Sequence, residues 1–153
     1  MKKIAILAAL MTPLMALPVV AEMSVEDQIE TRQSAYQFAA WNGKKIKAWA
    51  IEGSEEYSEQ DIIAAANAIA AVANSGMGTL FSRDSANDRA ENTRLKPNFF
   101  NELDNVKKIA VSFAQESTEL QKIVADGDRT AVAEQFNKVV DTCKSCHDNY
   151  RAD

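Results

Sequence analysis

The sequence predicts an all-α protein, an antiparallel four-helix bundle, from two observations. Apolar residues recur at spacings of three and four in four long segments, and no alternating strand pattern of comparable length is present. Two short connections and one long connection join these segments, and short connections place neighbouring helices antiparallel. We therefore expect one domain with its core between four helices.

The first predicted helix spans residues 25–51. Ser24 followed by Asp27 resembles an N-terminal capping box, and Asn42-Gly43 is a candidate interruption. Its apolar residues form two stripes, which is more than one neighbouring helix requires. The stripes are Val25, Ile29, Tyr36 and Ala40, and Ala35, Phe38, Ile46 and Trp49. This width indicates either a helix central to its own bundle or a homodimer interface, and we favour the homodimer.

The second predicted helix begins after Ser58, which with Asp61 forms a capping pair, and its apolar face is rich in alanine. Small side chains allow a neighbouring helix to come close, either inside the subunit or across a dimer. Residues 74–96 then form a loop of 23 residues. A loop of this length in a compact domain generally has a function.

The third predicted helix starts at Pro97, a residue favoured at the first helical position. Asp126-Gly127 predicts its end, and Asp128 predicts the N-cap of a fourth helix. The seam of the third helix is Phe99, Leu103, Val106, Ala110, Phe113, Ser117, Leu120 and Val124. The stripe of the fourth is Val132, Phe136, Val139, Cys143, Cys146 and Tyr150. The end of the fourth helix therefore turns two thiols toward the core.

These thiols belong to the pentapeptide Cys143-Lys144-Ser145-Cys146-His147, which has the spacing that attaches haem covalently. Each vinyl group needs one thiol, and the following histidine supplies an imidazole nitrogen to the iron. On a helix these three side chains share a face, so both thiols reach one edge of the macrocycle while His147 points beneath its centre. The sequence thus predicts one covalently bound haem c inside the bundle, near the C-terminus of the fourth helix.

Three other uses of this motif agree less well with the sequence. A dithiol redox pair needs a thiolate stabilised at a helix N-terminus, whereas these thiols would lie near a helix C-terminus. A zinc site needs a fourth ligand, and the chain has no other cysteine and no other histidine. A disulfide between residues three apart would close a small loop and stabilise the fold little.

Residues 1–21 have the pattern of a bacterial secretory signal peptide: two lysines, a short apolar run, and small residues suited to cleavage after Ala21. The run is too short for a membrane anchor. Cleavage would leave residues 22–153 as one haem domain in the periplasm. Without Lys2 and Lys3, 15 basic residues stand against 22 acidic ones, a net charge of −7. Such a charge argues against non-specific binding of nucleic acid.

The chain after this signal resembles the class II c-type cytochromes, in particular the cytochrome c′ family, over essentially its whole length. A haem motif at the end of a four-helix chain is typical of this class. Three segments carry the resemblance: Arg32-Gln33-Ser34-Ala35-Tyr36, Thr93-Arg94-Leu95-Lys96-Pro97 and Cys143-Lys144-Ser145-Cys146-His147-Asp148-Asn149-Tyr150-Arg151.

The resemblance implies a role for each of several residues. Cys143 and Cys146 hold the haem, and His147 is the proximal ligand of the iron. Arg32 matches a family arginine near a haem propionate, and Arg151 matches the one beside the proximal imidazole. A cation there discourages imidazolate character and weakens the iron–histidine bond.

Tyr36 falls at the distal position of the family, which is aromatic or aliphatic in five-coordinate members and methionine in six-coordinate, low-spin relatives. Arg32 and Tyr36 are four residues apart, so the guanidinium can reach the haem edge while the phenol lies over the ring. Phe81 matches a family aromatic in the long loop, although the tryptophan that often precedes it by three residues is Gly78 here. Other loop candidates are Met77 and Leu80 for the haem face, and Arg83, Arg89, Arg94 and Lys96 for the propionates.

Tyr36 offers iron no soft or basic neutral donor, so the sixth position is open unless Met77 ligates. The resemblance then implies a periplasmic haem protein with five-coordinate, high-spin iron that binds nitric oxide and carbon monoxide and can transfer electrons to an unidentified redox partner. The alternative is a six-coordinate, low-spin electron carrier, which would have methionine at position 36. We do not expect an enzyme, because peroxidase-like turnover needs a distal acid–base pair and His147 is the only histidine.

Overall fold

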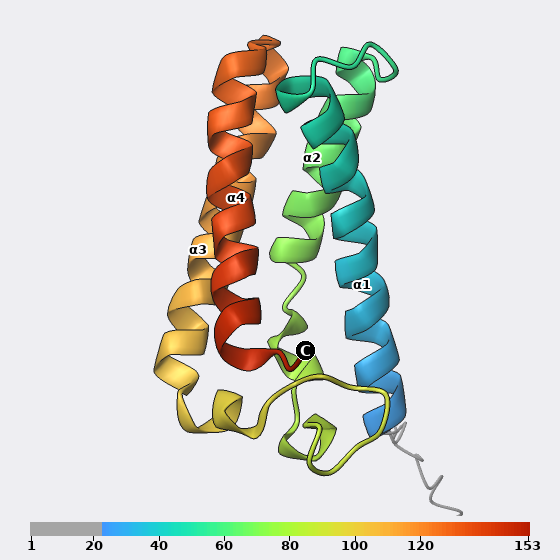
Figure 1. The fold of residues 1–153 in the computed structure, drawn as a ribbon, viewed down its shortest axis with the longest axis vertical. Helices are drawn as coiled ribbons and strands as arrows, with labels where there is room; N and C mark the ends of the chain where they lie inside the picture. The colour runs from blue at the N-terminus through green and yellow to red at the C-terminus, as the bar shows by residue number, and fades with distance from the viewer. Residues whose placement is uncertain (1–22) are drawn as a thin grey trace, which may run out of the picture.

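In a computed structural model, which describes residues 23–153, the chain forms an antiparallel bundle of four helices (Figure 1). The helices are α1 Val25–Ile46, α2 Glu59–Ala73, α3 Leu103–Ile123 and α4 Arg129–Tyr150. α1 and α3 run in one direction and α2 and α4 in the other, which confirms the predicted fold. The predicted signal peptide, residues 1–21, lies outside the described residues. In the part of the chain that the structure describes, no helix is long and apolar enough to cross a membrane.

Three predicted helix starts have the capping contacts that their sequences indicate. The Ser24 hydroxyl accepts a hydrogen bond from the backbone N–H of Asp27 at 3.1 Å. Ser58 and Asp61 form a full capping box, and the Asp128 carboxylate accepts two backbone N–H groups of the first turn of α4. Each such cap stabilises its helix by about 1 kcal/mol, because it satisfies backbone donors that the helix itself leaves free.

The first helix is continuous through Asn42 and Gly43. The Asn42 amide donates to the carbonyl of Phe38 one turn earlier, at 3.0 Å. Gly43 faces the ring of Phe136, which would lie 3.4 Å from a Cβ added at this position, so glycine lets α4 come close. The chain then continues as a π-helical turn, η1 Lys47–Ile51, and the predicted end of the first helix is confirmed.

The start of the third helix differs from the prediction. Three 3-10 turns lie between α2 and α3: η2 Met77–Leu80, η3 Arg83–Ser85 and η4 Pro97–Asn101. Pro97 begins the last of these turns rather than the α-helix, which begins at Leu103. Glu102 separates the two, because its φ of −123° and ψ of 35° lie outside the helical region. The turn places Phe99 among the buried residues.

The hydrophobic core consists of two clusters along the bundle. The upper cluster joins all four helices through Ile46, Trp49, Ile62, Ala65, Ala66, Ile69, Leu120, Val124, Val132, Phe136 and Val139. The lower cluster is Leu95, Phe99 and Tyr150, bordered by Phe81, Phe100, Val106, Ile109 and Cys146. Ala65 and Ala66 of α2 belong to the upper cluster, so they serve packing inside the subunit.

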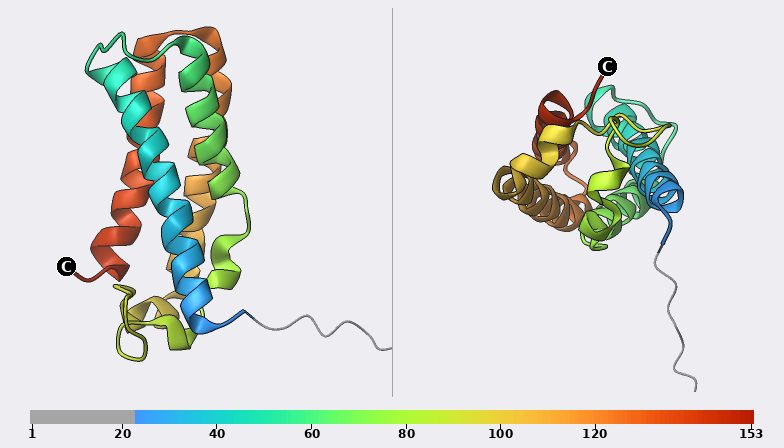
Figure 2. Two further views of the ribbon diagram at one scale, coloured as in Figure 1. Left: turned by 90° about the vertical axis from the view of Figure 1, so that its right-hand side faces the viewer. Right: turned by 90° about the horizontal axis from the view of Figure 1, so that it is seen from below.

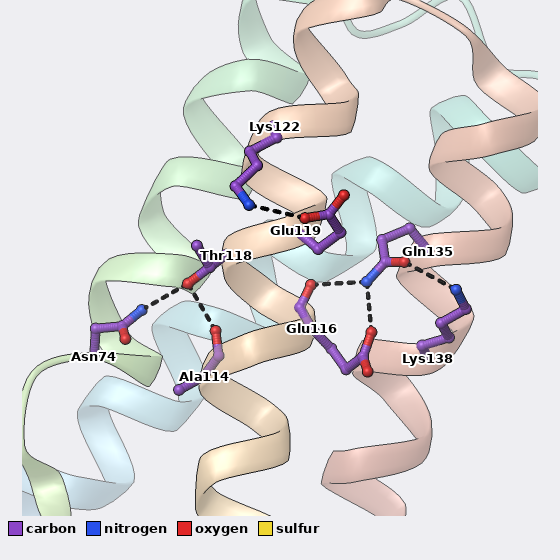
Figure 3. Close-up of polar contacts among 8 residues, drawn as sticks. All are labelled: Asn74, Ala114, Glu116, Thr118, Glu119, Lys122, Gln135 and Lys138. Carbon is purple, nitrogen blue, oxygen red and sulfur yellow. Dashed lines mark hydrogen bonds and ion pairs between the residues drawn. The ribbon is translucent and has the colours of Figure 1, made fainter.

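α4 keeps its place through contacts with α3 and η1. Gln135 of α4 is 3% exposed and donates to the Glu116 carbonyl at 3.0 Å and to its carboxylate at 2.7 Å (Figure 3). The Lys138 ammonium donates to the side-chain amide oxygen of Gln135 at 3.2 Å. α4 also packs on η1 at the upper end of the bundle, whereas α1 and α4 diverge toward the lower end (Figure 2).

Candidate haem site

Cys143 continues the buried face of α4 but is itself exposed. The residues that precede it on this stripe, Val132, Phe136 and Val139, are at most 6% exposed. Cys143 lies one turn further along the same face, and as a residue it is exposed. Cys146, one turn further, is half-buried at the border of the lower cluster. Both thiols therefore face the interior side of the bundle and remain accessible.

Tyr36 lies on α1 close to these thiols. The residue is 41% exposed, and it is near enough to Cys143, Cys146 and Arg32 to interact with their charges. Burial raises the pKa of Tyr36 to about 12, and the charges of Cys146 and Cys143 act in the same direction, while Arg32 opposes them. The phenol is therefore neutral at physiological pH. An aromatic ring and two thiols thus share one partly uncovered region between α1 and α4.

The imidazole of His147 lies on a separate groove, which neither Tyr36 nor the two cysteines line. His147 is exposed, and within residues 23–153 its ring makes no hydrogen bond. It lines an open groove of about 370 Å³. The other residues of the groove are Arg94, Lys96, Asp148, Arg151, Ala152 and Asp153. The ring is thus available as a ligand, and Arg151 shares its groove, as the resemblance implies.

The donor set fits haem c. Burial raises the pKa values of the Cys143 and Cys146 thiols, so both are protonated at neutral pH. A dithiol oxidoreductase needs the opposite shift, because the thiolate is its nucleophile. Two accessible thiols, an imidazole and a partly uncovered aromatic ring are what a covalently held macrocycle needs around it. Cys143 and Cys146 would hold the haem, and His147 would ligate its iron.

Arg32 fastens the long loop to α1, a role that the sequence did not predict. The residue is 4% exposed. Its Nη1 donates to the Leu80 carbonyl at 2.8 Å and to Ser85 Oγ at 2.6 Å. Its Nη2 donates to the Ser85 carbonyl and to Thr93 Oγ1, both at 2.9 Å. Both terminal nitrogens are occupied by the loop, and a contact of Arg32 with a haem propionate stays a prediction.

The guanidinium also lies over the ring of Phe81, 4.8 Å from its centroid. Burial lowers the pKa of Arg32, and the guanidinium forms no ion pair within residues 23–153. Phe81 in turn stacks on Phe99 at 5.0 Å, in the cluster that Cys146 borders. Phe81 is therefore beside the thiol region, and its contact with the haem face stays a prediction.

The other basic residues of the loop divide into two groups. Arg83 is held by Asp88 through two bonds of 2.8 and 2.7 Å, and Arg89 is held by Asp84 at 2.7 Å. These two arginines are committed to ion pairs, which makes them poor candidates for the propionates. Arg94 and Lys96 instead lie in the groove of His147 and remain candidates.

Known proteins resemble this chain over nearly its whole length. The family model described as Cytochrome C' matches residues 27–151. Cytochrome c′ of Rhodocyclus tenuis is 47% identical over 127 residues, which cover 82% of this chain and 94% of that protein. Cytochrome c′ of Allochromatium vinosum is 44% identical over 153 residues, 96% of this chain and 97% of that protein.

Two solved structures agree with these matches. A cytochrome c′ described as having an unusual ligand-controlled dimer dissociation has a TM-score of 0.78 at 44% identity, covering 87% of this chain and 100% of that one. Cytochrome c′ of Thermochromatium tepidum has a TM-score of 0.77 at 42% identity, with coverage of 87% and 100%. Together with the four-helix fold and the haem-attachment motif on α4, these matches show that the chain belongs to the cytochrome c′ family, which binds haem c.

Proposed function

We propose that this cytochrome c′ is a periplasmic haem protein with five-coordinate, high-spin iron that binds nitric oxide and carbon monoxide. The observation that carries the proposal is the neutral phenol of Tyr36 beside the two thiols. Haem, when bound, supplies an iron centre that takes one ligand from the proximal side and can accept another on the distal side. The residues on the distal side determine which ligand can bind there.

Tyr36 supports an open distal position because its proton is held tightly. A phenol is a poor ligand to ferrous iron unless it ionises, and burial keeps the pKa of Tyr36 near 12. The ring is large and partly uncovered, so it restricts access by size without competing for the metal. A small neutral diatomic molecule is the ligand class that such a residue admits most readily.

Arg151 supports a weak proximal bond. It lies four residues after His147 and lines the same groove. A cation beside the imidazole disfavours loss of the second ring proton, so His147 would bind as a neutral imidazole rather than as an imidazolate. Neutral imidazole is the weaker donor, so the bond that His147 would supply to the iron would be weak.

We further propose a homodimer through the outer face of α1. Phe38 and Trp41 are 50% and 54% exposed there, and their rings stack with centroids 5.9 Å apart. The Lys45 ammonium lies 3.5 Å from the centroid of the Trp41 ring. Two adjacent exposed aromatic residues are typical of protein interfaces. The solved relative with ligand-controlled dimer dissociation also forms dimers.

We also propose that the protein is exported to the periplasm and that its haem can transfer electrons. The signal-like residues 1–21 and the thioether chemistry of Cys143 and Cys146 support export to the periplasm, with residues 22–153 as the haem domain. The haem can exchange electrons with a redox partner, and no group in the described site supplies a distal acid–base pair for an enzyme. The alternative, a low-spin electron carrier, would require a residue that ligates the iron at the sixth position, which the proposal leaves open beside Tyr36.

Optical spectra and carbon monoxide binding test the role of Tyr36. Tyr36→Ala should leave the resting spectrum high-spin and should make carbon monoxide bind faster and more tightly, because an obstruction is removed and no bond to iron is lost. Tyr36→Met should move the spectrum toward a low-spin, six-coordinate form. Gln37→Ala, an exposed neighbour on α1, is the control and should change neither property.

Two results would decide against the proposal. A low-spin spectrum of the wild-type ferrous protein would favour the six-coordinate electron carrier. Unchanged carbon monoxide association in Tyr36→Ala would show that Tyr36 does not line the distal pocket.

A further inference from the structure

The chain end that follows His147 is attached to the long loop by backbone hydrogen bonds. Leu95 and Arg151 form an isolated antiparallel bridge. The Lys96 N–H donates to the Tyr150 carbonyl, and the Ala152 N–H donates to the Arg94 carbonyl, both at 2.8 Å. The last residues of a chain are ordinarily poorly ordered unless they are tied down in this way.

Tyr150 attaches the same turn to the start of α3. Its side chain is 1% exposed, and its hydroxyl donates to Glu102 Oε2 at 2.9 Å. The Asn105 amide donates to the same hydroxyl at 2.7 Å. The ring meets Phe99 edge-on, with centroids 5.6 Å apart and an interplanar angle of 83°. The phenol is therefore fixed at both its polar and its apolar end.

His147 depends on this support more than most metal ligands do. A ligating histidine is usually oriented by a hydrogen bond from its second ring nitrogen. Within the described part of the chain, His147 has no such bond, so the position of its ring depends on the backbone that carries it. That backbone belongs to the last helical turn, where the Arg151 N–H donates to the His147 carbonyl at 3.0 Å. Helix ends open first unless their groups are held from outside.

We propose that Tyr150, together with its partners Glu102 and Asn105, is a positioning residue for the proximal ligand. By fixing the last turn of α4, it holds the His147 imidazole at one distance and one angle relative to the haem iron. This inference rests on the proposed role of His147 as the proximal ligand. Loss of the phenol contacts lets the turn adopt several positions, and the iron–histidine bond then varies from molecule to molecule.

Resonance Raman spectroscopy of the ferrous holoprotein measures that variation directly, through the iron–histidine stretching band. Tyr150→Phe removes only the hydroxyl and should broaden and shift this band. Glu102→Ala should do the same, whereas Glu102→Gln retains an accepting oxygen and should keep the wild-type band. Tyr57→Phe is the matched control, because Tyr57 packs against the upper cluster, away from the end of α4.

Hydrogen exchange of the amides from 147 to 152 gives a second readout, and it should be faster in Tyr150→Phe than in the control. Asn105→Ala replaces Tyr150→Phe if the latter yields no folded holoprotein. An unchanged band in these variants would overturn the positioning role, even if the melting temperature fell. Equal broadening in Tyr57→Phe would also overturn it, since the effect would then be general loosening. Absence of the band from the wild-type protein would instead refute His147 as the ligand.

Discussion

Replacing Arg32 with methionine tests whether its guanidinium fastens the long loop. Methionine keeps an unbranched apolar side chain, but it is shorter and removes the donors to the Leu80 carbonyl, the Ser85 carbonyl and Thr93 Oγ1. Ser85 Oγ keeps its own bond to the Ser82 carbonyl. Each buried acceptor left without a partner costs about 1–3 kcal/mol.

The summed loss is reduced because the variant no longer buries a guanidinium, whose desolvation is unfavourable in the wild type. We expect the free energy of unfolding to fall by about 2–4 kcal/mol. The free energy of unfolding of Arg32→Lys should lie between those of the wild type and Arg32→Met. A lysine ammonium can still donate, but it lacks the planar guanidinium group that reaches several acceptors at once. The loop amides from 85 to 93 should exchange hydrogen faster in both variants.

Urea denaturation of the holoprotein, followed by far-ultraviolet circular dichroism, measures these losses. Gln33→Ala is the control: it removes an exposed bond of 2.7 Å to the Asn92 carbonyl of the same loop. This change should alter stability by less than about 0.5 kcal/mol, as most surface substitutions do. A loss below about 1 kcal/mol for Arg32→Met, with unchanged exchange of the loop amides, would refute the fastening role.

Two further predictions concern α1. Trp41→Glu places a charge on the exposed aromatic face and should convert the dimer to monomers in sedimentation equilibrium; wild-type protein at monomer mass would contradict the dimer itself. Tyr36 should ionise with a pKa of about 12, as followed by NMR of ring-labelled tyrosine with Tyr36→Phe as reference. Burial, the largest cause, persists when the thiols are thioethers. Because the unfolded phenol ionises near 10, Tyr36 makes stability decrease as pH rises from about 10 to 12, and a native midpoint near 10 would contradict this.

Local patterns were sufficient to predict three of the four helix starts. Ser24, Ser58 and Asp128 cap their helices through contacts that span only two or three residues, so the sequence contains both partners of each contact side by side. The spacing of the two thiols and His147 is equally local. Helix periodicity also predicts that the motif faces the core, and of its three functional residues Cys146 borders the lower cluster while Cys143 and His147 are exposed.

Contacts between distant segments were not predictable in this way. Arg32 lies 53 residues from Ser85 and 61 from Thr93, and Tyr150 lies 48 from Glu102. Periodicity shows which face a residue occupies, but not which loop atom meets it. The expectation that Arg32 meets a propionate followed from the family pattern, whereas its four bonds to the loop follow from how the loop closes.

The length of this loop has a mechanical explanation. A haem motif in the last turn of the last helix would lie on a segment that opens easily. The loop leaves α2, meets Arg32 on α1 through Ser85 and Thr93, and two residues later pairs with the end of α4 (Figure 1). A short connector could not reach both helices, and lengthening a loop raises its closure entropy only slowly. The helix that carries Tyr36 and the turn that carries His147 therefore share one support, so changes in the loop should affect both sides of the haem.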